Sequence, residues 1–395
     1  MLNIKSRTGT VGNAKLCLLS ILCSALCVLL TACVQQPASL KQRAEATNRI
    51  NAVKLGKLRA RGEAGDTESQ FNMGVMYTRG EGVPQNYAEA AKWFRKAAEH
   101  GDARAQARLA VMFANGEGMP ANMPEAVRWY RMAADQGNAD AQANLGALYV
   151  QGNGIPKDYR EAVTWFRKAA EKGDAYSQAC LGSLYARGLG VKQDFTEALT
   201  WYRKAAEQDY PEGEFYLGVA WEKGQGVPQD YAEAVRWLRK AADRNHAGAQ
   251  TELAELYVSG DGVAQDFAEA VKWLRLAADR EYPQALCDLG LMFEKGQGLQ
   301  RSMADALLWY RKAAEQGNAE AQGRLGICYD EGIGASRDSV EAYKWFNLSA
   351  AQGNKKAAEW RDSLAHSMTR DQITEAQHRA TEFLAKRPLT LASGL

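Results

Sequence analysis

Histidine, cysteine and paired acidic residues are the side chains of this 395-residue chain that could carry out chemistry. The four histidines, His100, His246, His366 and His378, are scattered, and no HExxH or paired CxxC spacing gathers metal ligands. The chain has no GxSxG nucleophile elbow and no Walker loop. Gly-x-Gly pairs recur, but no predicted strand precedes them, so they do not indicate dinucleotide binding. The sequence predicts no catalytic residue, no metal site and no cofactor.

One cysteine stands where a covalent modification is expected. The first 15 residues carry three basic and no acidic side chains, and the apolar segment 16–30 is too short for a comfortable transmembrane helix. The segment ends in Leu-Thr-Ala-Cys at positions 30–33, which resembles the bacterial lipobox. The resemblance implies that a signal peptide, residues 1–32, is removed and that acyl chains on Cys33 hold the protein on a membrane. An uncleaved signal anchor is the alternative interpretation.

The residue after the cysteine and the charge balance bear on the compartment and the partner. Val34 stands where inner-membrane lipoproteins typically carry Asp, so the resemblance favours the outer membrane, facing the periplasm. Loss of residues 1–32 would lower the formal net charge from +2 to −1. A nearly neutral chain without a basic stripe is an unlikely partner for nucleic acid. Cys180, Cys287 and Cys328 are odd in number, and we expect them to be buried and unpaired.

A tryptophan recurs every 36 residues and marks an internal repeat. The surrounding segments align without a gap over residues 65–352, and the first reads GDTESQFNMGVMYTRGEGVPQNYAEAAKWFRKAAEH. Stacked units of this kind bury one continuous core that a single unit cannot form. We therefore expect the repeated tryptophans to fill space between helices. They are Trp93, Trp129, Trp165, Trp201, Trp237, Trp273, Trp309 and Trp345.

Each unit divides into two predicted helices. Apolar residues at helical spacing form the first helix, which ends at a Gly-x-Gly pair such as Gly80 and Gly82. The second helix begins with a predicted capping box, in which Asn86 caps the first turn and Glu89 reaches back to it. A terminal glycine ends most units, but Asp209, Asn245 and Glu281 replace it in three of them.

The pattern of glycines, tyrosine, Gly-x-Gly-Val-Pro and Glu-Ala-x-x-Trp resembles the Sel-one-like repeat (SLR), a relative of the tetratricopeptide repeat. This implies an all-α, right-handed solenoid of eight helix–loop–helix repeats with a concave surface. The predicted domains are the signal peptide 1–32, a lipidated tether with an N-terminal capping helix 33–64, the repeats 65–352, and capping helices with a tail 353–395. The chain lacks the disulfide within each repeat that cysteine-rich relatives carry.

Comparison of the eight units with one another separates scaffold from surface. The tryptophan, the glycines and the capping acids barely change, whereas a first-helix stripe at spacing 4, 3, 4 varies freely. Such a face is either plain solvated surface or a recognition surface. Units five to seven gain aromatic residues at their junctions and unit five concentrates them, so we expect the groove around units four to six to hold the partner. The predicted partner-binding residues are Arg104, Arg108, Tyr176, Arg187, Glu212, Tyr216, Lys223, Glu252 and Glu255.

These features favour a non-enzymatic, membrane-anchored periplasmic scaffold that binds a protein partner in the concave groove. A narrower hypothesis is an immunity protein, because lipoproteins with these repeats resemble the immunity partners of phospholipase effectors of type VI secretion. A host-interaction factor and a β-lactam hydrolase, which the cysteine-rich relatives suggest, are further alternatives. The sequence does not choose among the partners.

Overall fold

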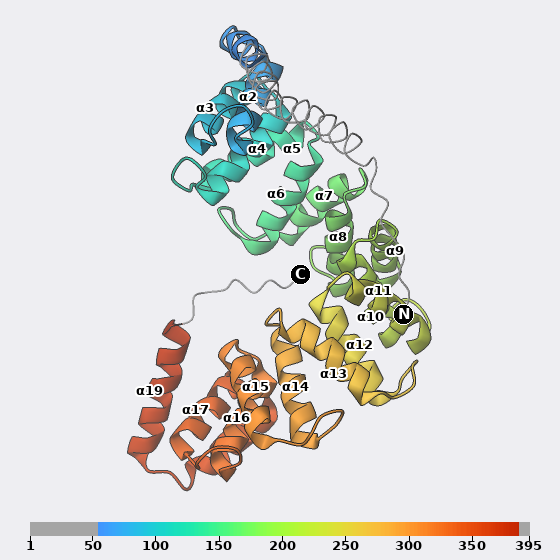
Figure 1. The fold of residues 1–395 in the computed structure, drawn as a ribbon, viewed down its shortest axis with the longest axis vertical. Helices are drawn as coiled ribbons and strands as arrows, with labels where there is room; N and C mark the ends of the chain where they lie inside the picture. Colours follow the sequence, from blue (N-terminus) through green and yellow to red (C-terminus); the bar gives the residue numbers. More distant parts are fainter. Residues whose placement is uncertain (1–53, 387–395) are drawn as a thin grey trace, which may run out of the picture. The chain divides into compact units, whose positions relative to one another are not determined.

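The computed structural model describes residues 54–386, and within this range the secondary structure consists of helices and turns without strands (Figure 1). The described residues fall into an N-terminal unit, 54–132, and a C-terminal unit, 133–386. This confirms the all-α prediction. Cys33 and the tether lie outside the described residues.

Each repeat is a pair of antiparallel helices. The first helices of repeats 1 to 8 are α2 (Thr67–Arg79), α4 (Ala103–Asn115), α6 (Ala139–Gln151), α8 (Ala175–Arg187), α10 (Pro211–Lys223), α12 (Ala247–Ser259), α14 (Pro283–Lys295) and α16 (Ala319–Glu331). The second helices are α3 (Tyr87–Glu99), α5 (Met123–Asp135), α7 (Tyr159–Ala170), α9 (Phe195–Ala206), α11 (Tyr231–Asp243), α13 (Phe267–Ala278), α15 (Met303–Glu315) and α17 (Ser339–Ala351).

Of the two interactions in the predicted capping box, the N-cap side chain makes its hydrogen bond as predicted, but the glutamate three residues later does not reach back. Asp158 Oδ1 accepts the backbone N–H groups of Arg160 at 2.8 Å and Glu161 at 3.2 Å, as an N-cap should. The Glu161 carboxylate instead accepts the indole N–H of Trp165 at 3.2 Å. It has no reason to reach back, because the Asp158 amide already donates to the carbonyl of Tyr149 at 2.9 Å.

The repeated tryptophans lie against the core, as predicted. Five of them are at most 7% exposed, and the amine of a lysine three residues later often lies over the ring, as Lys168 does 3.9 Å from the centre of Trp165. The tryptophans of repeats 5 to 7 are only partly buried. They are Trp237, Trp273 and Trp309.

The turns that end the second helices explain the repeated glycine. Gly173 has a φ of 94°, in the left-handed region that glycine adopts without strain. Asp209, Asn245 and Glu281 hold this region with φ of 58°, 67° and 57°, where a side chain is unfavourable. Arg280, one repeat later, donates from Nη1 to the Asn245 carbonyl at 2.9 Å and thereby supports one of these turns.

A buried glutamine joins each of several repeats to the helix before it. Gln106 is 1% exposed, and its Nε2 donates to the carbonyl of Ala98 at 3.1 Å, near the end of the preceding second helix. The Ala98 carbonyl also accepts the backbone N–H of Gly101 at 3.0 Å, so the glutamine adds a second hydrogen bond to it and satisfies its own buried amide. Six glutamines at one register make this contact, and we call them the glutamine ladder. They are Gln70, Gln106, Gln142, Gln178, Gln250 and Gln322.

Repeat 5 replaces the ladder glutamine with a carboxylic acid. Glu214 is fully buried, and neither of its side-chain oxygens has a hydrogen-bond partner among the described residues. Arg244 Nε lies 3.7 Å from Oε2. Burial raises the pKa of Glu214 above its usual value, while Arg244 and Lys240 oppose that change and Asp209 and Asp243 add to it.

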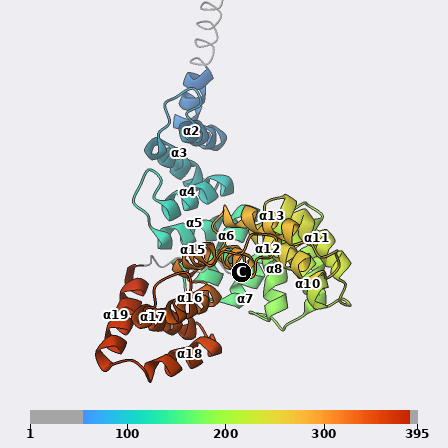
Figure 2. The same cartoon turned by 60° about the horizontal axis from the view of Figure 1, so that its bottom comes forward.

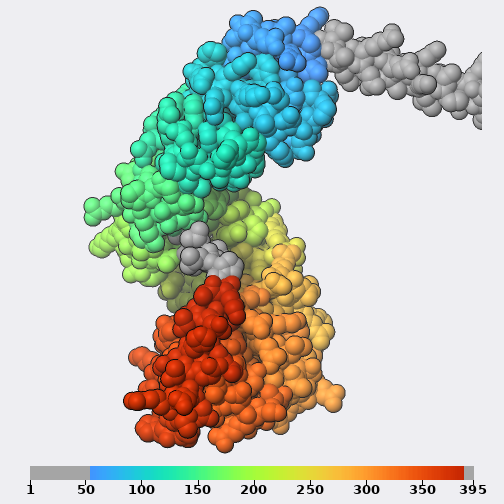
Figure 3. Space-filling model, turned by 90° about the vertical axis from the view of Figure 1, so that its left-hand side faces the viewer, coloured from blue at the N-terminus to red at the C-terminus, as the bar shows by residue number. Residues whose placement is uncertain are grey.

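The last repeat is covered by two further helices, α18 (Lys355–Ala365) and α19 (Arg370–Lys386). Figures 1 and 2 place α19 beside α17, and Figure 3 shows the red C-terminal segment lying directly against the orange eighth repeat. Phe383 packs edge-on against Trp345 with ring centres 5.2 Å apart, and Arg379 pairs with Glu341 at 2.9 Å. These helices cap the C-terminal end of the array. Helical residues 54–63 precede repeat 1.

We expect Glu214→Gln to stabilise the protein by about 1–3 kcal/mol at neutral pH, because an amide restores the missing ladder donor. A raised pKa means that the folded chain favours the protonated acid, so this contribution to stability is lost as pH rises through the folded-state pKa. The gain in thermal midpoint should therefore be larger in mildly alkaline than in mildly acidic buffer. The exposed Glu315→Gln at the end of α15 is the control. Destabilisation by Glu214→Gln would show instead that the Arg244 pair outweighs the missing bond.

Candidate partner-binding face

In the C-terminal unit the first helices form the tighter side of the array. α8 packs directly on α10, and α12 packs on α14, whereas the second helices of successive described repeats do not pack on one another to that extent. A stack whose first helices approach more closely than its second helices curves toward the first helices. The variable stripe on α8, α10, α12 and α14 therefore lies on the inner side of this curve, and we call it the inner face.

Tyrosines lie at both ends of the inner face. Tyr176 on α8 is 39% exposed and meets Phe166 edge-on, with ring centres 6.0 Å apart. Tyr216 on α10 stacks on Tyr202 at 5.0 Å and is half-buried. Tyr282 at the start of α14 is 36% exposed. These rings give the face rigid apolar area with polar hydroxyls, a combination common at protein interfaces.

Carboxylates occupy the rest of the inner face. Glu252 and Glu255 on α12 interact electrostatically with Asp288 on α14, and Glu222 at the end of α10 interacts with both glutamates. Asp288 Oδ1 accepts a hydrogen bond from Gln284 Nε2 at 3.0 Å. Its other oxygen, like one oxygen of Glu222, is buried without a hydrogen-bond partner. Two acceptors just beneath the face are thus left unsatisfied by the described residues.

These carboxylates hold their protons unusually tightly. Burial, followed by repulsion from Glu252 and Asp288, raises the pKa of Glu255 to about 8, although the side chain remains accessible to water. Burial also raises the pKa of Asp288 to about 7 and raises that of Glu252, which Lys223 partly opposes. A cationic group docked here would favour ionisation and would draw protons off the face near neutral pH.

The structure brings together most of the predicted binding residues. Tyr216 interacts electrostatically with Arg187 and Glu212, so these three lie close together on α8 and α10. Lys223 lies near Glu252 across the next junction. The predicted residues thus form one continuous set on the inner face of repeats 4 to 6. The set extends into repeat 7 through Tyr282 and Asp288.

Two of the predicted residues belong to the N-terminal unit. Arg104 on α4 pairs with Asp102 at 2.7 Å and Glu68 at 2.5 Å, and its guanidinium lies 4.4 Å from the centre of the Phe71 ring. These contacts join repeats 1 and 2, which gives Arg104 a structural role. Arg108, one turn further along α4, lines a cavity.

The described residues show no arrangement suited to metal binding. No group of three or more histidine, cysteine or acidic side chains is placed to hold an ion within residues 54–386. Cys180, Cys287 and Cys328 are buried and unpaired, as predicted. None of the described helices is both long and apolar enough to cross a membrane.

Comparison with known proteins identifies the repeat. The family model for the Sel1 repeat matches eight consecutive segments, from residues 67–102 to residues 319–354. The chain belongs to the Sel1 repeat family. The predicted SLR solenoid is thereby confirmed, and Sel1 repeats generally act as protein-binding scaffolds. The matched segments begin two residues after the boundaries that the repeat alignment suggests.

Several solved structures are similar to this Sel1 repeat chain. A Sel1 repeat protein from Oxalobacter formigenes is 32% identical, with 79% of this chain and 91% of that chain covered and a TM-score of 0.60. The protective antigen c5321 of uropathogenic Escherichia coli is 31% identical over 83% and 86%, with a TM-score of 0.45. The Pseudomonas aeruginosa immunity protein Pa5087 is 24% identical over 54% and 81%, with a TM-score of 0.41. No curated protein matches the chain.

Sequence reasoning missed two features of the Sel1 repeats. The glutamine ladder is visible as a 36-residue recurrence, but a polar residue on a helix is easily taken for surface, and only the structure shows that it is buried. The second feature is Glu222, whose position next to Lys223 suggests a solvated ion pair. One Glu222 oxygen is in fact buried beside the acids of α12.

His246 caps the first helix of Sel1 repeat 6, where repeats 1 to 4 and 8 use Asp or Asn. Its Nδ1 accepts the Ala249 amide at 3.0 Å, and its ring stacks on Phe215 with centres 4.5 Å apart. The acceptor role requires the neutral imidazole. Burial lowers the pKa of His246, with Glu212 opposing.

We expect acid to weaken this cap. Because the folded-state pKa of His246 is lowered, its contribution to stability is present above the unfolded pKa of about 6.5 and is lost as pH falls through the folded-state value. His246→Asn should keep the cap at all pH values and reduce the acid loss by about 0.5–2 kcal/mol. Urea unfolding at mildly alkaline and mildly acidic pH measures this. The exposed His378→Asn on α19 is the control, and an equal acid loss in wild type and His246→Asn would refute the role.

Proposed function

We propose that this Sel1 repeat protein is a non-catalytic scaffold, held on the periplasmic side of the outer membrane by acylated Cys33, that binds a protein partner on its inner face. The observation that carries the proposal is the convergence of exposed tyrosines and mutually repelling carboxylates from four consecutive first helices. Rigid aromatic rings supply contact area at low entropic cost, and the carboxylates supply specificity.

The chemistry of the face also defines the partner. Glu252, Glu255 and Asp288 repel one another, and Lys223 is the cation that interacts with Glu252. A partner that presents lysine or arginine side chains relieves this repulsion. We therefore propose a basic segment of the partner as the part that contacts repeats 5 to 7.

An arginine-rich peptide labelled with a fluorophore tests this chemistry by anisotropy. Glu252→Gln with Glu255→Gln should weaken binding about fivefold to tenfold, because two largely solvated charge interactions are lost. Wild-type affinity should rise between about pH 6 and about pH 9, since the raised pKa values of Glu255 and Asp288 leave the face partly protonated below that range.

The matched control removes two exposed carboxylates from the second-helix side, Glu171→Gln with Glu207→Gln at the ends of α7 and α9. Equal weakening by both double variants would reduce the interaction to net charge and would count against a specific face. In envelope extracts, a true partner should be captured by wild type and by this control but lost from Glu252→Gln with Glu255→Gln.

Metabolic labelling with a fatty acid tests the anchor, and Cys33→Ser should abolish the label.

Immunity against a secreted phospholipase is the narrower candidate. The lipobox-like sequence ending at Cys33 favours it, because an acyl anchor would hold the inner face close to the membrane on which a lipase acts. A phospholipase encoded by a neighbouring gene, and inhibited by this protein through the inner face, is the expected finding. If the Glu252→Gln and Glu255→Gln double variant still inhibited the phospholipase as wild type does, the inner face would not be the surface that binds the enzyme.

A further inference from the structure

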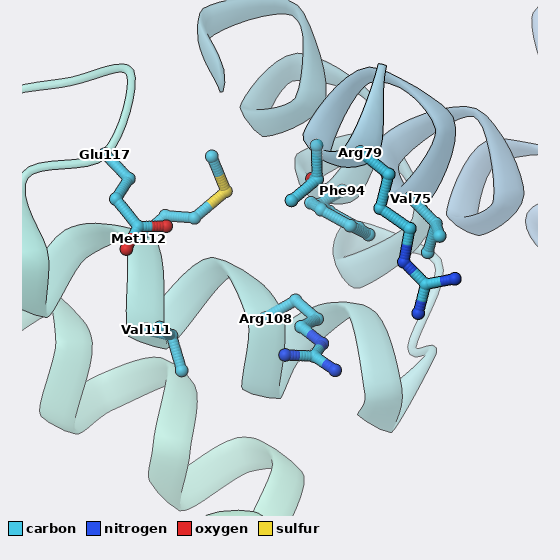
Figure 4. Close-up of a pocket in the computed structure, with 8 residues that line it drawn as sticks. Val75, Arg79, Phe94, Arg108, Val111, Met112 and Glu117 are labelled. Atoms are coloured by element: carbon cyan, nitrogen blue, oxygen red, sulfur yellow. The ribbon is translucent and has the colours of Figure 1, made fainter. Parts of the chain in front are cut away.

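Two arginines from neighbouring first helices line one cavity in the N-terminal unit. Arg79 ends α2 and Arg108 lies in the middle of α4, and both border a cavity of about 260 Å³ between repeats 1 and 2 (Figure 4). The inner face described above belongs to the C-terminal unit, so this cavity is a separate feature.

The pairing of like charges is unusual among the junctions of this chain. At the junction of repeats 5 and 6, the same two positions are occupied by Lys223 and Glu252, which carry opposite charges. Lys295 and Arg324 also carry like charge, but Arg324 bonds to Glu320 at 2.9 Å and to Glu294 at 3.4 Å. The junction of repeats 1 and 2 therefore differs, because among the residues that the structure describes Arg108 has no acidic partners like those of Arg324.

The acids near this cavity neutralise it only in part. Arg79 reaches Glu81 at 3.5 Å, and both of these side chains are more than half exposed, which makes the pair weak. Arg108 forms no ion pair within the described part of the chain. Glu117 also lines the cavity, and its carboxylate accepts a hydrogen bond from Asn115 Nδ2 at 2.9 Å. Two guanidinium groups thus face the cavity with one carboxylate, which favours an anion.

The remaining wall of the cavity is largely apolar. Val75, Val111, Met112 and Phe94 line it, and Phe94 is buried against Gly74, where even a Cβ would lie 2.6 Å from the ring. This fixes the ring and keeps the cavity floor rigid. The cavity is smaller than the roughly 300–1,000 Å³ of pockets for drug-sized ligands, so it suits a short apolar group.

We propose that this cavity binds a small amphipathic anion, whose short apolar chain contacts Val75, Val111 and Phe94 and whose acidic head group is bound by Arg79 and Arg108. A guanidinium presents two parallel N–H donors that match the oxygens of a carboxylate or a phosphate. The apolar chain explains why the arginines lie beside hydrophobic walls and not on an open polar surface. This site is independent of partner binding by the inner face.

Calorimetric titration of the full-length protein with sodium octanoate tests the proposal, with octyl phosphate as the second anionic probe. Octanoate should bind, whereas acetate, which lacks the chain, and octylamine, which reverses the charge, should bind at least tenfold more weakly. Tighter binding of octyl phosphate than of octanoate would identify a phosphate head group as the preferred one, and the reverse result would identify a carboxylate.

Arg108→Gln should weaken octanoate binding about tenfold, the effect of losing one charge-assisted hydrogen bond, and Arg79→Gln should act in the same direction. Arg187→Gln, at the position equivalent to Arg79 in repeat 4, is the matched control and should bind as wild type does. Thermal melts confirm that the variants fold. Absence of octanoate binding by wild type, or equal affinity for octanoate and octylamine, would overturn the proposal. Equal loss in Arg187→Gln would do the same.

Discussion

The hydrogen bond from a buried first-helix glutamine to the end of the preceding helix helps fix how one repeat follows another at six places in the described array, whereas repeats 5 and 7 carry Glu214 and Leu286 at this position. A buried side-chain amide without a hydrogen-bond partner is costly, and each ladder glutamine avoids this cost by donating to a carbonyl near the end of the helix before it. Gln106 pairs the carbonyl of Ala98, and five other ladder glutamines do the same at their own junctions. Because an amide must meet its acceptor within a few tenths of an ångström, the bond permits little rotation of one repeat against the next.

The variable stripe of the first helices carries different side chains in the two units of the chain. In the C-terminal unit this stripe brings together Tyr216, Glu252, Glu255 and Asp288, which come from three successive first helices. In the N-terminal unit the same stripe brings Arg79 and Arg108 to one cavity. Charges that would be solvated on a single helix become coupled when the repeats stack. Burial, and after it repulsion from Glu252 and Asp288, raises the pKa of Glu255 to about 8.

Departures from the repeat mark places where the scaffold is less stable than it could be. Glu214 occupies a ladder position without its donor, His246 caps a helix only while neutral, and Asp209, Asn245 and Glu281 hold backbone angles that suit glycine. All five lie in repeats 5 to 7 or at their junctions, beside the inner face. Natural proteins often retain less stable residues close to functional surfaces. Local opening of an array depends on its weakest junctions, so these repeats are the expected place for it.

The sequence by itself determined the architecture. The 36-residue recurrence of tryptophan, glycine and capping acid predicts two helices and two turns per repeat, because these signals act over a few residues of chain. It also predicts which stripe is free, since a position that varies from repeat to repeat is not held by packing. Only the tertiary structure decided what that stripe can do. Burial of Gln106, the coupling of Glu255 to Asp288 and the shared cavity of Arg79 and Arg108 all join separate helices. Distances between such residues depend on the angle at which rigid helices stack, and no local sequence signal specifies that angle.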